Sequence, residues 1–476
     1  MSIGSALSNA MSGLDAAAKS AELISSNVSN ALTPGYGKRN IALSSRQSAQ
    51  GGVKIDAVLR QENRIISSER RLADARNEQS SAQSLFFDNL INLLGELGAS
   101  SSLSGDISKL ENALLVASGL PSDTNRLQTV FNAATGLAQK FNAISNGIQK
   151  HRLDADNTIN GEVKILNTSL NALEKINQQV AAAKSQSMNT LGLIDKRNQL
   201  LDTVSKVLPV KVFNRSKGQI AIYSTTGQML LDSKAFKISF KPALNISAHS
   251  TIENKSLSKL QIEGQANFAN SELKLGGGRL ASAFDIRDVL GLEMQSRLDK
   301  LAFNMARTLQ AADIDQSLSA KNPGLFTDSG MLATSENLIG LSARLEVNAR
   351  VDPGKGGALW RIREGIGTTN SKNEGSPDLL IKLARAFRAS TQEDRNSIFD
   401  QSSLLISDIT LRKNDAETNA SFNSSFLQDL KLREQSLAVN TDHEMQHLLQ
   451  VKQAFAANAK VIKAVDDMLS LILKIK

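Results

Sequence analysis

The segment His443-Glu444-Met445-Gln446-His447 has the residue types and the spacing of a catalytic zinc site. Two histidines four residues apart share one face of a helix, where both can bind Zn²⁺, and the glutamate between them can act as the general base of a protease. Such a site needs a third protein ligand, commonly a Glu or His further along the chain. Beyond His447 the sequence offers only Asp466 and Asp467. We therefore interpret the segment as a chance match on a helix, and a zinc metalloprotease built on His443 and His447 is a remote alternative.

Glycine-rich segments are a second kind of candidate, because backbone N–H groups in such loops can bind phosphate. Gly276-Gly277-Gly278-Arg279 lacks the Gly-Lys-Ser/Thr ending of a phosphate-binding loop and the spacing of a dinucleotide-binding loop. We interpret it as a turn at a domain boundary. The sequence thus predicts a protein that is not an enzyme, with no catalytic, cofactor-binding or metal-binding residue and no cofactor.

Composition and charge bound the remaining classes of protein. The chain has 476 residues, 41% of them hydrophobic, which is enough to bury a core in two to four domains. It has no cysteine, so disulfides and thiolate chemistry are excluded. Its net charge is +8, but basic and acidic residues interleave, so a nucleic-acid-binding protein is an alternative that only the high pI favours.

The sequence also bears on where the protein is found. No segment approaches the about 20 consecutive apolar residues of a membrane-spanning helix, so we expect no insertion into a membrane. The first residues lack the basic and apolar parts of a secretory signal peptide. We therefore expect a protein that is either cytosolic or exported by a route that reads another signal.

Helices at both ends of the chain carry apolar residues at heptad-like spacing. In residues 3–31 the apolar positions recur every three or four residues, until Thr33-Pro34-Gly35 predicts the end of the helix. In residues 448–472 they recur about every 3.4 residues, close to the period of a left-handed coiled coil. The residues that we expect to form a subunit-interaction seam are Leu7, Met11, Leu14, Ile24, Val28, Leu448, Val451, Phe455, Ile462, Val465, Leu469 and Ile472.

Between the terminal helices the apolar periodicity is mostly helical, with one β-rich stretch. The spacing predicts a loop or short strands up to residue 53, and then helices over 56–98, 106–118, 122–184, 190–208, 280–316, 377–391 and 393–440. Residues 209–275 alternate apolar and polar side chains, with turns at Lys217-Gly218 and Thr226-Gly227, and residues 317–375 are irregular. The sequence thus predicts a mainly α fold, with long terminal coiled-coil-like helices, a central helical bundle and a small β-rich insert.

The two ends of the chain together resemble the flagellar axial proteins, which form rods, hooks and hook-associated structures. At the N-terminus the resemblance is carried by Ser12-Gly13-Leu14-Asp15-Ala16-Ala17, Ile24-Ser25-Ser26-Asn27-Val28-Ser29-Asn30 and Thr33-Pro34-Gly35-Tyr36. At the C-terminus it is carried by Glu444-Met445, Ala454-Phe455, Ala457-Asn458-Ala459-Lys460-Val461-Ile462 and Asp466-Asp467-Met468-Leu469. The two signatures in the right order are more specific than either one alone.

Within this group, the interior of the chain resembles the family of flagellar hook-associated protein 1, the first hook–filament junction protein. The similar segments are Leu114 to Phe141, Asp195-Lys196-Arg197-Asn198-Gln199-Leu200-Leu201 and Arg279-Leu280-Ala281-Ser282-Ala283-Phe284-Asp285-Ile286-Arg287-Asp288. Two features depart from the family pattern: His443 stands where an acidic residue is common, and the β-rich insert is short. A hook or distal rod protein is the nearest alternative, although those proteins have a β-dominated middle.

The resemblance implies a structural protein of the bacterial flagellum that joins hook to filament by polymerising through its N- and C-terminal helices. It implies an inner layer of residues 1–55 and 441–476, a helical bundle domain of residues 56–208 and 276–440, and a β-rich outer insert of residues 209–275. It also implies export through the flagellar type III channel and an extracellular location at the hook–filament junction.

The expected partners follow from the same resemblance. They are the hook protein, the second junction protein (hook-associated protein 3), further copies of the chain in a ring or helical layer, and an export chaperone on the C-terminal helix. Nucleic acid and membrane are not among them. An exposed seam over Leu448–Ile472 would otherwise associate with itself, which fits a chaperone-bound form before export.

Overall fold

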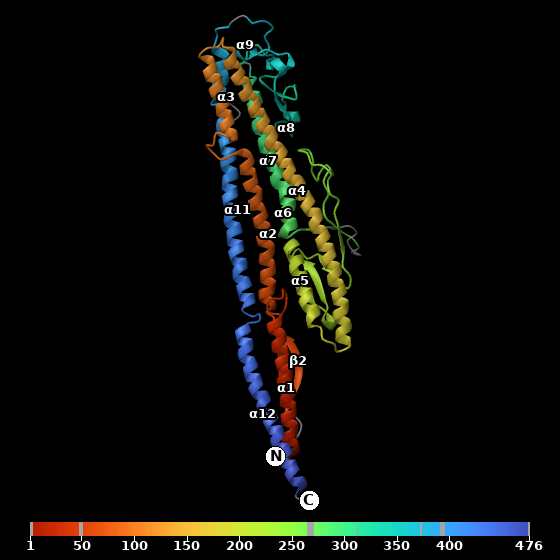
Figure 1. The fold of residues 1–476 in the computed structure, drawn as a ribbon. Coiled ribbons are helices and arrows are strands. Elements are labelled where there is room, and N and C mark those ends of the chain that lie inside the picture. The colour runs from red at the N-terminus through yellow and green to blue at the C-terminus, as the bar shows by residue number, and fades with distance from the viewer. Residues whose placement is uncertain are drawn as a thin grey trace. The chain divides into compact units, whose positions relative to one another are not determined.

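The structure, a computed structural model, describes residues 3–46, 51–263, 271–311, 313–371, 374–390 and 396–474. Within these ranges the protein is mainly helical, which confirms the predicted fold class (Figure 1). The predicted domains and helices also include residues 1–2, 47–50, 264–270, 312, 372–373, 391–395 and 475–476, and those parts of the predictions lie outside the described residues.

The chain divides into two compact units, and each unit is built from separate stretches of sequence. The first unit comprises Met1–Ala75, Leu166–Phe236 and Ser424–Lys476, and the second comprises Arg76–Ile165 and Lys237–Asn423. Three long helices contribute residues to both units: α2 (Arg64–Leu94), α4 (Thr124–Ser185) and α11 (Ile398–Gln435).

The first unit combines the two ends of the chain with a small sheet. Its helices, besides the start of α2 and the ends of α4 and α11, are α1 (Ile3–Ser29), α5 (Leu191–Val207) and α12 (Thr441–Lys474). Strands β1 (Arg39–Ser45) and β2 (Val53–Arg60) form an antiparallel hairpin. Strands β3 (Val210–Asn214), β4 (Ile220–Ser224) and β5 (Met229–Leu231) form an antiparallel sheet in the order β3-β4-β5, and the turn η1 (Ser216–Gly218) joins the first two.

The second unit is a helical bundle with short peripheral strands. Its remaining helices are α3 (Leu103–Ser118), α6 (Gly278–Asp285), the π-helical turn η2 (Ile286–Leu290), α7 (Gly291–Leu309), α8 (Leu341–Arg344), α9 (Arg361–Glu364) and α10 (Asp378–Ala386). Its strands are β6 (Lys237–Ser239), β7 (Gln261–Glu263) and β8 (Ser271–Glu272) in one sheet, and β9 (Phe326–Asp328) with β10 (Leu345–Val347) in another. Short 3-10 turns are η3 (Ser335–Asn337), η4 (Ala349–Val351) and η5 (Pro353–Lys355).

The core of the second unit consists of buried aliphatic and aromatic side chains from its helices. Its most deeply buried side chains are 0% exposed and belong to one continuous hydrophobic cluster. Among them are Leu90, Leu110, Phe141, Met305 and Phe387. Burial of each such side chain stabilises the fold by roughly 1.5–3 kcal/mol, and the sum offsets the backbone entropy lost in the long helices.

Capping side chains and turn glycines that can be read from the sequence set several of the helix and strand boundaries. Ser102 caps α3, because its hydroxyl accepts a hydrogen bond from the N–H of Gly105. Asp123 acts in the same way on the N–H of Asn125 at the start of α4, as the Pro121-Ser122-Asp123 sequence predicts. The predicted hairpin turns are also confirmed: Gly218 and Gly227 adopt positive φ values of 76° and 90° between paired strands.

The predicted helix over 56–98 is wrong in its first part. Residues 53–60 form strand β2, and α2 begins only at Arg64, where the side chain of Asn63 accepts hydrogen bonds from the N–H groups of Ile65 and Ile66. The strand is hard to predict because its pairing with β1 is irregular between Ala42 and Leu43, which breaks the alternation of side chains. Helix α7 ends at Leu309, earlier than the predicted residue 316.

The β-rich stretch contributes to both units. Strands β3–β5 belong to the first unit, and strands β6–β8 belong to the second. The division into inner layer, bundle and outer insert stays a prediction.

Candidate functional site

Helices α1 and α12, from opposite ends of the chain, pack against each other in the first unit (Figure 1). The buried face of α1 is made mostly of small residues, among them Ala10, Ala17 and Ser20. A Cβ atom added at Gly13 would lie 2.7 Å from Nδ2 of Asn458 on α12, so a larger residue there would have to displace the Asn458 side chain. Both residues belong to the terminal signatures.

The β1–β2 hairpin is held against α1 by two polar residues of the N-terminal signature. The hydroxyl of Ser12 accepts a hydrogen bond from the N–H of Val53 at 3.1 Å. Asn27, which is 1% exposed, donates to the carbonyl of Arg39 at 2.9 Å and accepts from the N–H of Arg39 at 3.0 Å. The hydroxyl of Tyr36 donates to the same side-chain oxygen of Asn27 at 2.9 Å. Asn27 thus pairs with the hairpin as a neighbouring strand would.

Glu444 joins this polar cluster from α12. Its carboxylate accepts a hydrogen bond from Nδ2 of Asn27 at 3.0 Å and forms an ion pair with Nζ of Lys38 at 2.7 Å. Glu444 is 2% exposed, and this burial pushes its pKa upward, but the hydrogen bonds from Lys38 and Asn27 outweigh that effect and leave the pKa below its ordinary value. A single carboxylate therefore ties α12 to α1 and to the loop before β1.

The same contacts bear on the zinc motif. Glu444 is already paired with a cation and an amide, so it is not free to act as a general base, while His443 and His447 are exposed on α12. Among the residues that the structure describes, no group of three or more His, Cys, Asp or Glu side chains is placed to hold a metal ion.

Acid should weaken the contact of α12 with α1 through Glu444. Since the folded-state pKa is lowered, the stabilisation is complete above the unfolded value of about 4.3 and is lost as the pH falls through the lower folded-state pKa. Because the chain has no cysteine, spin labels attach only at engineered Ala18→Cys on α1 and Lys463→Cys on α12. We expect the measured label distance to be single-valued at pH 6 and to broaden toward pH 3.

Glu444→Gln is the control for this experiment, because it keeps the shape of the side chain and removes its titration. In that variant the distance distribution at pH 6 should already resemble the acid form of the parent chain. The same pH dependence in both chains would show that other groups control the contact.

Asp195, from the segment that resembles the hook-associated family, anchors the hairpin to α5. Its carboxylate accepts from Nε of Arg60 at 2.8 Å, from Nη2 of Arg39 at 3.3 Å and from the N–H of Gly37 at 3.2 Å. Four residues later on the same helix, the side chain of Gln199 donates to the carbonyl of Pro34. The acidic residue and the glutamine thus position the loop that follows α1.

Arg70 connects α2, α5 and α11 in the first unit. Its guanidinium forms ion pairs with Asp74 at 2.6 Å, Asp202 at 2.6 Å and Glu434 at 2.5 Å, while Arg71 also pairs with Asp202 at 2.7 Å. Burial lowers the pKa of Arg70, but the three carboxylates more than compensate, so its charge is strongly favoured. The network fixes the end of α11, from which the chain passes to α12.

The predicted seam residues differ in burial. Ile24 and Val465 are buried, and the partly buried ones are Leu7, Leu14, Val28, Leu448, Val451 and Ile462. The exposed ones are Met11 at 58%, Phe455 at 42%, Leu469 at 40% and Ile472 at 55%. On α1, small and polar residues beside the heptad positions make up most of the buried side chains. The part of the seam in contacts between subunits stays a prediction.

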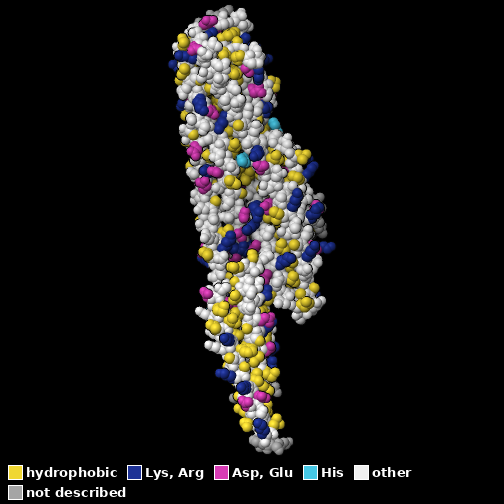
Figure 2. Space-filling view, viewed as in Figure 1, with side chains coloured by type: hydrophobic (Ala, Val, Ile, Leu, Met, Phe, Trp, Pro, Cys, Tyr) yellow, Lys and Arg dark blue, Asp and Glu magenta, His cyan; other side chains and the backbone are white. Residues whose placement is uncertain are grey.

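Helix α12 leaves a long apolar surface uncovered. Of its described residues only Glu444 and Val465 are buried, and Figure 2 shows apolar side chains gathered over the α1–α12 pair. We call this surface the α12 apolar face, defined by the exposed residues Met445, Leu449, Phe455, Val461, Met468, Leu469, Leu471, Ile472 and Leu473. Exposed apolar patches of this extent mark sites of association.

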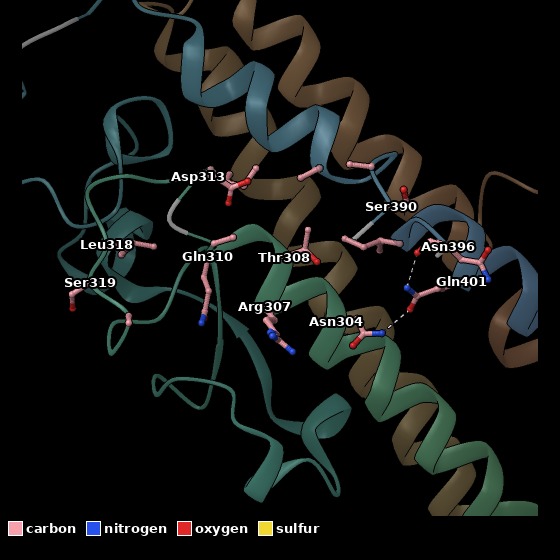
Figure 3. A pocket seen from close by; sticks show the side chains of 16 residues that line it. Asn304, Arg307, Thr308, Gln310, Asp313, Leu318, Ser319, Ser390, Asn396 and Gln401 are labelled. Carbon is pink, nitrogen blue, oxygen red and sulfur yellow. Dashed lines mark hydrogen bonds between the residues drawn. The ribbon is translucent and has the colours of Figure 1, made fainter. Parts of the chain in front are cut away.

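The second unit contains a cavity of about 710 Å³ between the end of α7 and the segment from α10 to α11 (Figure 3). Asn304 donates to Gln401 at 2.8 Å, and Gln401 donates to the carbonyl of Asn396 at 2.9 Å. Asp313 is the only carboxylate among the described residues that line the cavity, and no described histidine lines it. This lining assembles no acid–base pair.

Sequence reasoning missed the polar residues that hold the terminal helices together. Asn27 and Glu444 lie 417 positions apart, and Lys38 stands in a loop, so no periodicity connects them. The one sequence feature that could have indicated this contact is the polar side chain of Asn27 within an otherwise apolar helical pattern.

Comparisons with known proteins agree with this architecture. Residues 87–317 match the helical domain of the flagellar hook-associated protein FlgK, and residues 435–475 match the C-terminal domain of flagellar basal body rod FlgEFG proteins. Flagellar hook-associated protein 1 of Bacillus subtilis is 22% identical over 71% of this chain and 69% of its own length. Flagellar hook-associated protein 1 of Salmonella typhimurium is 21% identical over the full length of both chains.

A solved structure of the flagellar hook junction protein FlgK from Burkholderia pseudomallei aligns with 55% of this chain and 47% of its own, with 20% identity and a TM-score of 0.46. The chain thus spans about half of that structure.

Over its helical interior and over its full length, the chain is similar to flagellar hook-associated protein 1, and this similarity supports a structural component of the flagellum. None of the described helices has the length and apolar character needed to span a bilayer.

Proposed function

We propose that the chain joins hook to filament by polymerising through α1 and α12. The observation that carries this proposal is the α12 apolar face, which one copy of the chain leaves open. The polar contact of Glu444 with Asn27 and Lys38 holds α12 against α1, so the two helices can enter an assembly together.

The energetics support association over an isolated chain. Each fully buried Leu, Ile, Phe or Met side chain contributes roughly 1.5–3 kcal/mol, and the α12 apolar face offers nine apolar side chains to neighbouring copies. Knobs-into-holes packing between such helices is the usual way in which period-3.5 seams are covered. The partners at this surface are further copies of the chain, the hook protein and the second junction protein, hook-associated protein 3.

The same surface requires protection before assembly. An export chaperone that covers the C-terminal helix would prevent early self-association, and passage through the flagellar type III channel would deliver the chain to the extracellular junction. Both statements are part of the proposal and rest on the apolar exposure of α12 and on the family relationship.

Phe455→Asp should lower incorporation into flagella more than tenfold, because a carboxylate would be buried without a partner between subunits. Incorporation is measured as the amount of the chain in purified hook–basal bodies, and motility as swimming in soft agar. The far-UV circular dichroism of the purified variant should be unchanged, because Phe455 is 42% exposed in the single chain.

Gln453→Asp is the matched control, since it places the same charge two residues earlier on an exposed position of α12. It should incorporate normally. Normal incorporation of Phe455→Asp would contradict the proposal, and equal loss in both variants would show that charge alone, rather than the apolar face, decides assembly.

A further inference from the structure

The sheet of the first unit has one edge that no described residue covers. Its strand order is β3-β4-β5, so β3 and β5 are the edge strands. The outer edge of β5 is partly closed, because Leu231 bridges to Ala235 and the N–H of Phe236 donates to the carbonyl of Leu230 at 3.0 Å. Strand β3 has no such neighbour among the described residues.

Pairing with β4 fixes which backbone groups of β3 face outward. Hydrogen bonds from Arg215 to Gln219 and from Thr225 to Pro209 set the register, so Lys211 and Phe213 pair with β4. The alternate residues, Val210, Val212 and Asn214, therefore turn their N–H and C=O groups away from β4. Val210 is buried, so Val212 and Asn214 are the residues that present these groups at the open edge.

Elsewhere in this sheet, outward backbone groups have side-chain hydrogen-bond partners, whereas no described residue pairs with those at the open edge. On β4, Asn177 of α4 satisfies both backbone groups of Ile220, donating to its carbonyl at 2.7 Å and accepting from its N–H at 3.1 Å. Proteins commonly block free edges with charged side chains or β-bulges. An uncovered edge with apolar side chains is a template for another strand. On β3, Val212 is 37% exposed and Phe213 is 49% exposed.

An aromatic and basic surface lies next to this edge. Phe213 and Tyr223 contact each other edge to face at 5.4 Å, and Nη2 of Arg215 donates to the hydroxyl of Tyr223 at 3.3 Å. With Lys211 and residues of the following turn they line a shallow pocket of about 360 Å³. A side chain from an added strand would reach this pocket from the edge.

The charge of the region selects the partner. Residues 206–236 contain five basic residues and one acidic residue, Asp232, which already pairs with Arg215 at 2.9 Å. The unbalanced charge is carried by Lys206, Lys211, Lys217 and Lys234. An acidic chain is attracted, and a chain with backbone N–H and C=O groups can pair with the edge, which nucleic acid cannot do.

We propose that the open edge of β3, with its aromatic and basic face, binds an extended acidic segment of another protein as an added strand. This surface is distinct from the α12 apolar face and does not depend on polymerisation through α1 and α12.

A fluorescein-labelled peptide of alternating valine and glutamate tests the proposal by fluorescence polarisation with the full-length chain. Two peptides serve as comparisons, one with lysine in place of glutamate and one with proline in place of each second valine. We expect binding of the acidic peptide and at least tenfold weaker binding of both comparison peptides. Equal binding of the three, or preference for labelled single-stranded DNA over the acidic peptide, would overturn the proposal.

Two variants place the binding at β3. Val212→Pro removes an outward N–H that β4 does not use, and Lys211→Glu reverses a charge without touching the backbone. Each should weaken binding at least tenfold, whereas Lys164→Glu, on an exposed position of α4 in the second unit, should leave it unchanged. Because Lys211→Glu alters only a solvated side chain, full binding by that variant would overturn the proposal even if Val212→Pro fails to fold.

Discussion

Replacing Arg70 by leucine should destabilise the first unit by about 3–5 kcal/mol, the usual cost of removing the cation next to a buried carboxylate, here that of Asp74. The Arg70 side chain is 9% exposed and Asp74 is 2% exposed, so water cannot replace the lost partner. Asp202 and Glu434, which are about a third exposed, would repel each other across the vacated position. Leucine fills part of the volume but supplies none of the hydrogen bonds.

Native-state hydrogen exchange measures this effect locally, which suits a chain of two units. The amides of α5 and of the end of α11 should exchange more than about a hundredfold faster in Arg70→Leu. Arg64→Leu is the matched control on the same helix, because that side chain is 73% exposed and lies 3.7 Å from Glu62. Its exchange rates should change less than about fivefold, as expected for a surface ion pair. Equal effects of the two substitutions would contradict the claim that the Arg70 ion pairs stabilise the first unit more than a surface ion pair does.

The second large effect is expected at Arg287, in the π-helical turn between α6 and α7. Its side chain is fully buried, and it pairs with Asp156 at 2.6 Å, with Asp288 at 2.8 Å and with the carbonyl of Ser258 at 2.9 Å. The guanidinium also lies over the ring of Phe284, 4.7 Å from its centroid. Arg287→Met should therefore cost about 3–5 kcal/mol in the second unit, chiefly because the fully buried Asp156 loses its cation.

A double-mutant cycle separates this cause from lost packing. Asp156→Leu removes the orphaned charge, so the double variant should be destabilised by less than the sum of the two single variants. Hydrogen exchange of residues 243–262 is the measurement, since Asp156 also accepts from the N–H of Ala243. Arg297→Met on α7 is the control, because its partners Glu293 and Asp408 are more than a third exposed. Additive effects of the two buried substitutions would contradict the account.

Much of the fold could be predicted because it depends on local signals. The long helices follow from apolar periodicity over many turns, and the hairpin turns follow from glycines at positions that need positive φ. Strand β2 was not predicted, because an irregular pairing interrupts the alternation of its side chains within eight residues. The buried face of α1 was not predicted, because alanine, serine and glycine allow close helix approach but add little to an apolar pattern.

The polar contacts of the site could not be predicted from spacing. Asn27 with Glu444, Arg70 with Glu434 and Arg287 with Asp156 each join residues more than a hundred positions apart. A charged residue on a helix has no sequence feature that separates a buried partner from a solvated one. Asp195 was singled out only through its resemblance to a family segment, and the structure gives it a role in holding Arg39 and Arg60.

Immunogold electron microscopy of intact flagellated cells, with an antibody against this chain, tests the central claim most directly. We expect label confined to the narrow zone between hook and filament. Label distributed along the hook would indicate a hook protein instead, and label found only in the cytosol of flagellated cells would contradict the proposed place of the chain in the flagellum.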